Sequence, residues 1–196
     1  MVSAPSGTGK TTITNFLQKQ NIVRVAVSYT TRAPRLGEKN GEQYFFIDQA
    51  EFMRMRDRGE FLEWAEVFGN FYGTARRWVE QQLAANTRLV LELDVQGALQ
   101  VKKQIPAATL IFIRPPSLQD LARRLRARAA DSPQAIALRL SRADSEMQEA
   151  QKYDHVIIND NLRCAIAKTI DIIAAKDKNI SVAAMTGDII EHDKQC

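Results

Sequence analysis

A stretch of small, hydroxyl-bearing and basic residues near the start of the chain has the spacing of a phosphate-binding loop. Residues 4–11 read Ala-Pro-Ser-Gly-Thr-Gly-Lys-Thr, which is the pattern G-x-x-x-x-G-K-S/T with alanine in the first glycine position. Gly7 and Gly9 permit backbone conformations closed to residues with a Cβ, so that successive N–H groups can face phosphate oxygens. Lys10 would bring its charge to the β- and γ-phosphates, and Thr11 its hydroxyl to a magnesium ion. The pattern predicts a loop that holds a nucleoside triphosphate.

Residues 4–11 could also form an ordinary turn of glycine, serine and threonine before a helix. The Gly-Lys-Thr ending coincides with a predicted helix start, and this favours the phosphate loop. A helix that begins there would direct its positive end at the same anion. Only Met1-Val2-Ser3 precede the loop, whereas an average strand has about 5 to 6 residues. We therefore expect Met1 to lie inside the first strand of the fold.

A second group of residues has the chemistry of a nucleoside monophosphate site. Arginines can bind a phosphate with two parallel hydrogen bonds, and tyrosine hydroxyls can donate to the same oxygens. A partly buried carboxylate needs paired donors, and the N1–H and N2–H₂ edge of guanine offers two adjacent ones. Taken singly, each of these residues could equally be a core, rim or solvent-facing side chain; the combination favours the site. Its members are Arg32, Arg35, Tyr44, Glu63, Tyr72 and Thr74.

Arginines are concentrated in residues 114–142, where no lysine occurs. A charge run of this kind often forms a solvated helix face, and that alternative stays open for the cluster taken by itself. The exclusive use of arginine favours bidentate binding of an oxyanion. The arginines in this segment are at positions 114, 123, 124, 126, 128, 139 and 142.

The composition bounds the class of protein. The 196 residues suit one domain or one core with inserted subdomains. No apolar run approaches the roughly 20 residues that span a bilayer, so we expect a cytoplasmic protein without a membrane partner. Two cysteines and two histidines suggest neither a zinc site nor a nucleophilic triad.

Strand-like and helix-like patterns alternate along the chain. The predicted strands cover residues 23–28, 44–46, 61–68, 89–94, 109–113 and 156–158, with a turn at 69–73. Three helices are predicted without a named cap: residues 11–20, a helix that follows the strand 89–94 and ends at 103, and a helix from 132 to about 153. Four helices are predicted to begin at a capping residue: Asp48 (with Glu51, ending at Gly59), Thr74 (ending at about 85), Ser117 (with Asp120) and Asn161 (ending at about 176).

Strands alternating with helices predict an α/β fold with a doubly wound parallel sheet, interrupted by a β-rich insert. We expect a core with the phosphate loop (1–27 and 78–113), the insert (28–77), an arginine-bearing helical region (114–142), the rest of the core (143–180) and a weakly patterned tail (181–196).

Several linked segments of the chain resemble guanylate kinases, the ATP:GMP phosphotransferases. The segments are 28–32 (SYTTR), 35–38 (RLGE), 41–46 (GEQYFF), 61–65 (FLEWA), 69–74 (GNFYGT) and 92–97 (ELDVQG). The resemblance runs from the loop to about Asp160. It implies a P-loop kinase with a doubly wound parallel core sheet, a GMP-binding insert and a mobile helical lid.

The resemblance also implies roles for individual residues. Those expected to bind ATP are Ala4, Pro5, Ser6, Gly7, Thr8, Gly9, Lys10, Thr11, Thr12 and Asn159. Those expected to bind GMP are Ser28, Arg32, Arg35, Tyr44, Glu63, Tyr72, Thr74 and Asp94, with Glu38 orienting Arg35. Those expected to act in catalysis are Lys10, Arg124, Arg128 and Arg139. Helical spacing puts Arg124 and Arg128 on one face, and Arg126 is expected to point elsewhere. Mg²⁺, bound with ATP, is expected on Thr11.

Two positions depart from the pattern of the family. Glu92 stands where aspartate is usual, at the end of the strand that faces the magnesium and its waters, and we expect it to act outside the direct ligands of the ion. Ala129 replaces a common glycine and would stiffen a hinge. Asn159 and Asp160 resemble the adenine and ribose contact region, although an asparagine at a strand-to-helix turn has a purely structural explanation as well.

Three other functions compete with this one. The first is a non-catalytic guanylate-kinase-like module that binds proteins; the retained loop and lid arginines argue against it. The second is a sibling kinase with another phosphorylated acceptor, against which Glu63, Ser28 and Thr74 favour guanine. The third is nucleic-acid binding by the arginine-rich helices, which would leave the phosphate loop idle. We expect ATP and GMP as the ligands, no nucleic acid, and a monomer or homodimer.

Overall fold

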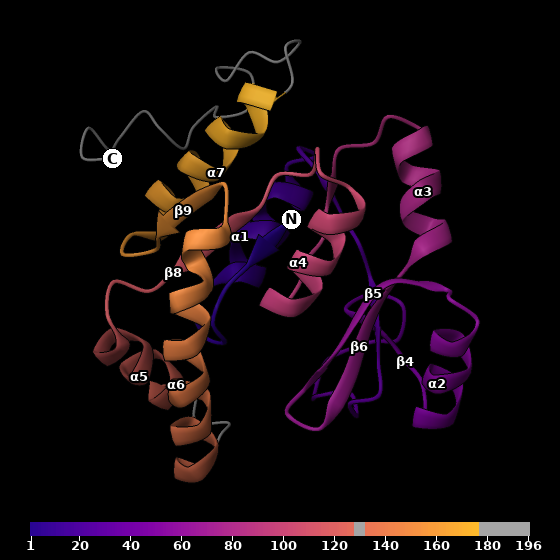
Figure 1. The fold of residues 1–196 in the computed structure, drawn as a ribbon. Coiled ribbons are helices and arrows are strands. Elements are labelled where there is room, and N and C mark those ends of the chain that lie inside the picture. Colours follow the sequence, from indigo (N-terminus) through magenta and orange to yellow (C-terminus); the bar gives the residue numbers. More distant parts are fainter. Residues whose placement is uncertain (128–131, 177–196) are drawn as a thin grey trace. The chain divides into compact units, whose positions relative to one another are not determined.

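The fold was obtained as a computed structural model that describes residues 1–127 and 132–176 (Figure 1). The chain forms two compact units. The insert unit comprises Met1 and Val23–Ala108, and the loop unit comprises Val2–Ile22 and the described residues from Thr109 onward. All residues predicted to bind GMP belong to the insert unit, and the phosphate loop belongs to the loop unit. The finer domain boundaries given above stay a prediction.

A small parallel sheet forms the centre of the loop unit. Its strand order is β1-β8-β9, and the strands are β1 (Val2–Ser3), β8 (Ile111–Arg114) and β9 (His155–Ile158). Three consecutive apolar residues of β8 are buried, as expected of a strand covered on both faces. The helices of this unit are α1 (Lys10–Lys19), α5 (Leu118–Ala127), α6 (Pro133–Gln148) and α7 (Leu162–Lys176), with a 3₁₀ turn at Glu149–Lys152.

Helices α5 and α6 lie side by side (Figure 1), and apolar side chains pack between them. Leu121, Leu125 and Ala143 are fully buried between them, and Ile136 and Leu140 complete the contact. The arginines of the two helices are therefore carried on a packed pair. No helix in the described part of the chain has the length and apolar content needed to cross a membrane.

The insert unit contains two sheets. Strands β2 (Arg24–Val25) and β7 (Leu89–Val90) form a parallel pair. A mixed sheet has the order β4-β3-β6-β5, with strands β3 (Ser28–Thr30), β4 (Tyr44–Phe46), β5 (Phe61–Val67) and β6 (Asn70–Ala75). The helices of this unit are α2 (Gln49–Asp57), α3 (Arg76–Ala84) and α4 (Val95–Gln104).

The mixed sheet has one apolar and one polar face, because side chains alternate along a strand. On one face, Tyr29, Phe61 and Phe71 pack with Phe52 and Met55 of α2. The other face carries hydroxyl, phenol and carboxyl groups from all four strands. The register aligns them, with Ser28 beside Tyr44, Thr30 beside Tyr72, and Glu63 beside Thr74.

A β-bulge in β5 makes this separation possible. Phe61 and Glu63 are two residues apart and would lie on the same face of a regular strand. The register shifts between them, so that Phe61 joins the apolar cluster while Glu63 contacts Thr74 on the polar face. An extra residue in one strand redirects the side chains that follow it.

Several predicted helix starts are confirmed by the hydrogen bonds of their caps. Asp48 accepts from the amide of Glu51 at the start of α2, and Ser117 accepts from the amide of Asp120 near the start of α5. Asn161 accepts from the amide of Cys164 at the start of α7. These caps were readable from the sequence because they use residues only three positions apart.

The predicted turn at 69–73 and the predicted cap at Thr74 are wrong. Only Phe68 and Gly69 form the turn between β5 and β6, and both have positive φ, as a tight two-residue hairpin requires. The chain therefore returns to the sheet at Asn70. Thr74 lies within β6, and α3 begins after it at Arg76 without a side-chain cap. The strand predicted at 89–94 is also shorter, since only its first two residues form a ladder.

Candidate active site

Two glycines shape the phosphate loop of the loop unit. Gly7 has φ 95° and Gly9 has φ 103°, values that L-residues with a Cβ rarely adopt. The amide of Thr8 donates to the carbonyl of Pro5 at 3.1 Å, and this bond closes the loop just before α1 begins. Gly9 occupies the N-cap position of α1, so the positive end of the helix follows the loop directly. The predicted anion cradle has the conformation that its sequence requires.

The same glycines are also needed for space. A Cβ on Gly7 would lie 2.8 Å from Cδ2 of Leu125 in α5, and a Cβ on Gly9 would lie 2.6 Å from Nδ2 of Asn159. Real Cβ atoms essentially never come so close to another heavy atom. The loop is thus enclosed by the end of β9 and by α5, both of the loop unit.

Three polar side chains hold the loop from outside. Asn159 is 4% exposed and donates through Nδ2 to the carbonyl of Thr8 at 2.7 Å. Arg124 of α5 donates to the same carbonyl at 3.4 Å and to the carbonyl of Asn159 at 2.8 Å. Arg139 of α6 donates to Oγ of Ser6 at 2.6 Å. The predicted catalytic arginines 124 and 139 therefore converge on the loop.

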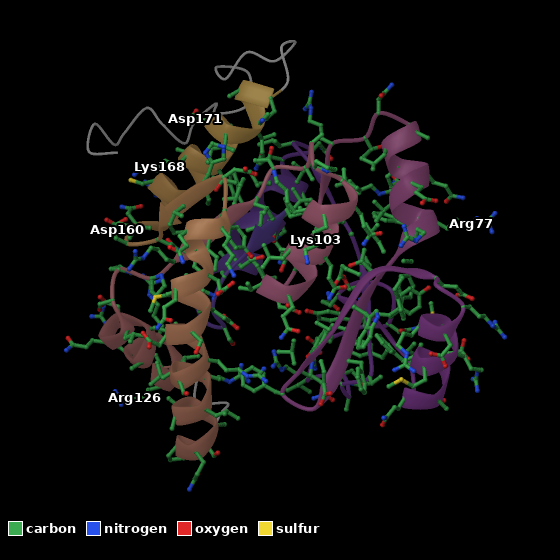
Figure 2. The ribbon with its side chains drawn as sticks, viewed as in Figure 1. Arg77, Lys103, Arg126, Asp160, Lys168 and Asp171 are labelled. Atoms are coloured by element: carbon green, nitrogen blue, oxygen red, sulfur yellow. The ribbon has the colours of Figure 1, made fainter. Side chains whose placement is uncertain are left out.

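The remaining donor-side predictions have different outcomes. Arg126 is exposed on α5, as expected for a side chain that points elsewhere (Figure 2). Arg128 and Ala129 lie outside the described residues. Asn159 was expected near the adenine or ribose, and this stays a prediction; in the structure its side chain donates to the loop backbone. Lys10 and Thr11 open α1, directly after the loop.

On the insert unit, three side chains form a hydrogen-bonded chain on the polar face of the sheet. Thr74 donates its hydroxyl to Oε1 of Glu63 at 2.6 Å, and Oγ of Ser28 lies 3.2 Å from the Thr74 hydroxyl oxygen. A threonine hydroxyl has one proton to donate. Because Thr74 gives that proton to Glu63, Ser28 is the donor in the other bond.

Glu63 is 4% exposed, which is unusual for glutamate. A carboxyl group held away from water requires hydrogen-bond donors, and Thr74 supplies one of them. A ligand edge with adjacent N–H groups would supply more. Four residues, Ser28, Glu63, Thr74 and Asp94, were predicted to recognise the guanine edge, and the first three of them are thus brought together.

Arg32 lies beside the predicted tyrosines. Its guanidinium carbon is 5.5 Å from the ring centre of Tyr44 and 5.7 Å from that of Phe46. The rings of Tyr44 and Tyr72 are 5.8 Å apart in an edge-to-face arrangement. Burial raises the pKa of the Tyr44 phenol to about 12, and the charges of Glu92 and Tyr72 act in the same direction. Tyr44 therefore keeps its proton at neutral pH and can donate it to an anion.

Glu38 fixes Arg32 rather than the side chain of Arg35. Nη2 of Arg32 donates to both carboxylate oxygens of Glu38, at 2.9 and 3.0 Å, while Arg35 reaches Glu38 through its backbone amide at 2.6 Å. Burial by itself raises the pKa of Glu38, but the bonds from Arg32 and Arg35 outweigh it, and the pKa is lowered. Arg35 itself is exposed.

Asp94 and Glu92 follow β7. One oxygen of Asp94 caps α4 by accepting from the amides of Gln96 and Gly97, at 2.6 and 3.0 Å. Glu92 is half-buried, and its charge is close enough to raise the pKa of Tyr44.

Several residues that shape this site were not assigned a role from the sequence. Phe46 supports Arg32, and Gln100 and Gln104 attach α4 to β5. Gly97 packs directly on Glu63. A glycine inside a helical pattern is unfavourable and was the one available signal, but it does not say which group the glycine admits.

The phosphate loop and the monophosphate-type residues together define a P-loop nucleoside monophosphate kinase. The guanylate kinase family model matches residues 1–176. The chain is 48% identical over 176 residues to "Guanylate kinase" of Aromatoleum aromaticum, covering 89% of this chain and 86% of that protein. It is 50% identical over 167 residues to "Guanylate kinase" of Dechloromonas aromatica, with coverage of 85% and 83%.

The fold agrees with these sequence relatives. The crystal structure of guanylate kinase from Anaplasma phagocytophilum matches with a TM-score of 0.75 and 33% identity, covering 94% of this chain and 90% of that chain. The chain belongs to the guanylate kinase family.

The support that Asn159 gives to the loop leads to a first prediction. Asn159→Ala removes the bond to the Thr8 carbonyl, and we expect the KM for ATP to rise by about 2- to 10-fold, the worth of one neutral hydrogen bond. The KM for GMP should stay unchanged, because the GMP residues belong to the insert unit. Steady-state kinetics with each nucleotide varied in turn measures both. Lys168→Ala, an exposed change in α7 (Figure 2), is the control, and an unaltered KM for ATP in Asn159→Ala would contradict the prediction.

Proposed function

We propose that this chain transfers the γ-phosphate of ATP to GMP, and also to dGMP, giving ADP and GDP or dGDP. The observation that carries the proposal is the buried Glu63 carboxyl, bonded to Thr74 on a sheet face that also holds Arg32 and two tyrosines. The same chain contains a phosphate loop with the left-handed glycines that the loop needs. The carboxyl group could bind the guanine base, and Arg32 with the two tyrosines could bind the phosphate, so this sheet face fits GMP.

The acceptor nucleotide would be recognised at both ends. The N1–H and N2–H₂ groups of guanine donate to Glu63, whereas adenine presents an unprotonated N1, an acceptor, at the corresponding position. Ser28, Thr74 and Asp94 contact the same edge. Arg32, Arg35, Tyr44 and Tyr72 bind the phosphate of GMP, with Glu38 holding Arg32 in place.

The donor nucleotide would be held by the loop unit. The backbone of residues 4–12 surrounds the phosphates, and Lys10 contacts the β- and γ-phosphates. Arg124 and Arg139 already contact the loop, so a small change of their side chains would bring them to the transferring group. Arg128 would join them as the third arginine.

The reaction needs no general base. The second pKa of a phosphomonoester is about 6, so an oxygen of GMP is already anionic at neutral pH. That oxygen attacks the γ-phosphorus, and the bond from this phosphorus to the bridging oxygen of ADP breaks. Negative charge spreads over the equatorial oxygens in the transition state, and the guanidinium groups and Lys10 stabilise it there.

Magnesium fits the donor side by its chemistry. Mg²⁺ prefers oxygen ligands, keeps several waters and needs few protein groups when phosphates are bound. Thr11, an exposed residue at the start of α1, offers the hydroxyl oxygen that would hold it. Glu92 would act on the ion from outside its direct ligands. When bound, the ion neutralises charge on the phosphates.

We propose that the reaction serves guanine nucleotide salvage and recycling in the cytoplasm, with ATP and GMP as the ligands of the enzyme. We propose a monomer or homodimer that binds no nucleic acid. A protein-binding module without catalysis would have no need for a loop that is braced by two arginines and an asparagine.

The direct test is an ADP-release assay on the wild-type protein with GMP, dGMP, AMP and UMP. We expect turnover with GMP and dGMP and very little with AMP or UMP. Equal rates with all four acceptors, or no ATP-dependent turnover with GMP, would refute the proposal.

Lys10→Ala should abolish measurable transfer, a loss of at least about 10²- to 10³-fold in kcat, because it removes the charge at the transferring phosphate. GMP binding, measured by calorimetry without ATP, should survive. Lys19→Ala, at the exposed end of the same helix, is the matched control. Wild-type turnover in Lys10→Ala would remove the loop from the mechanism.

Glu63→Ala should lower the preference for GMP over AMP by about 10²-fold, since two hydrogen bonds to a charged acceptor are lost. The ratio of kcat/KM for the two acceptors gives the result. Glu66→Ala, an exposed change on the same strand, should keep the wild-type ratio. A ratio in Glu63→Ala equal to that of Glu66→Ala would show that the carboxyl does not read the base.

A further inference from the structure

Gly97 lies in the first turn of α4 although its backbone does not need a glycine. It is absent from the positions with positive φ, and it is the third residue of a regular helix. Glycine is a poorer helix former than alanine. A close contact at its Cα offers a reason for its presence.

The contact is with the carboxyl group of Glu63. A Cβ on Gly97 would lie 2.3 Å from Oε2 of Glu63 and 3.1 Å from its Cδ. Both residues are buried and both belong to the insert unit. The missing side chain of Gly97 is the space in which the carboxyl group lies.

The helix cannot easily retreat from this contact. Gln100 of α4 donates to the carbonyl of Trp64 at 2.9 Å and accepts from its amide at 3.3 Å. Gln104 of α4 donates to the carbonyl of Leu62 at 2.7 Å. These bonds attach α4 to β5 at the residues on either side of Glu63. The amide of Gly97 is also tied to Asp94.

The carboxyl group is the part that would have to move. On its other side, Oε1 accepts from Thr74 at 2.6 Å. A methyl group at position 97 would push the carboxyl group away from the position in which it holds this bond, while α4 and β5 stay joined. The Glu63 carboxyl group is thus held on one side by the Thr74 hydroxyl and bounded on the other side by the backbone of Gly97.

We propose that Gly97 is a positioning residue that determines the selectivity for the acceptor base, by admitting the Glu63 carboxyl group between α4 and Thr74. The proposal rests on the proposed function, because it assigns Gly97 to the recognition of guanine. Gly97 touches neither the base nor the phosphates in this account. It acts through Glu63 alone.

The test compares Gly97→Ala with the wild type and with Gln96→Ala, an exposed change in the same helical turn. For Gly97→Ala we expect the KM for GMP to rise on the order of 10- to 100-fold, the larger part of the loss lying in KM rather than kcat. The ratio of kcat/KM for GMP over AMP should fall by a similar factor. Calorimetric binding of GMP and AMP without ATP should show the same loss of preference, and Gln96→Ala should match the wild type.

A shorter acid at position 63 supplies the rescue. Glu63→Asp withdraws the carboxyl group by one methylene, so adding Gly97→Ala to Glu63→Asp should cost far less than adding it to the wild type. If the single variant Gly97→Ala fails to fold, the double variant tests whether crowding of the Glu63 carboxyl group is the cause. A folded double variant supports the crowding of the carboxyl group, and an unfolded one overturns it.

The outcomes separate this inference from the proposed function. A wild type that does not prefer GMP refutes the function itself. A wild type that prefers GMP, together with a Gly97→Ala variant that keeps this preference, overturns only the role of Gly97. An equal loss toward GMP and AMP with a lower melting temperature also overturns it, since that pattern is the one expected of a purely structural glycine.

Discussion

The burial of one carboxyl group constrains the whole insert unit. Glu63 is almost completely removed from water, and a buried carboxyl without donors would be strongly destabilising. The β-bulge turns it away from the aromatic cluster around Phe52, and Thr74 on the neighbouring strand donates to it. The result is an acceptor that is fixed before any base arrives, so little ordering is left to occur on binding.

The loop unit solves a different problem, because its ligand is a highly charged anion and not a pattern of donors. Positive charge is supplied by backbone amides, Lys10 and arginines, and the backbone must be held open around the phosphates. The carbonyl of Thr8 does not bind the anion; it accepts hydrogen bonds from Arg124 and Asn159. The bonds to that carbonyl from outside the loop stabilise the conformation that Gly7 and Gly9 permit.

Much of this architecture could be predicted because its signals are local. The loop glycines, and the caps formed by Asp48 and Asn161, depend on residues within a few positions of one another. The bulge could not be predicted, because the spacing of Phe61 and Glu63 is that of an ordinary strand and only the pairing with β6 reveals the extra residue. The bracing of the loop by Arg124 was equally hidden, since the bond spans 116 positions of sequence. The family resemblance predicts that Arg124 belongs to the site, and the structure shows that it contacts the carbonyl oxygens of Thr8 and Asn159.

The two glutamines of α4 have a consequence beyond the site. Strand β5 is at the edge of its sheet, and an edge strand with unpaired amides and carbonyls can recruit a strand from another molecule. Gln100 and Gln104 occupy the backbone groups of Trp64 and Leu62 with their own side-chain amides, as a neighbouring strand would. The helix thereby takes up backbone groups in the first half of this edge strand, which are then not available to a strand from another molecule.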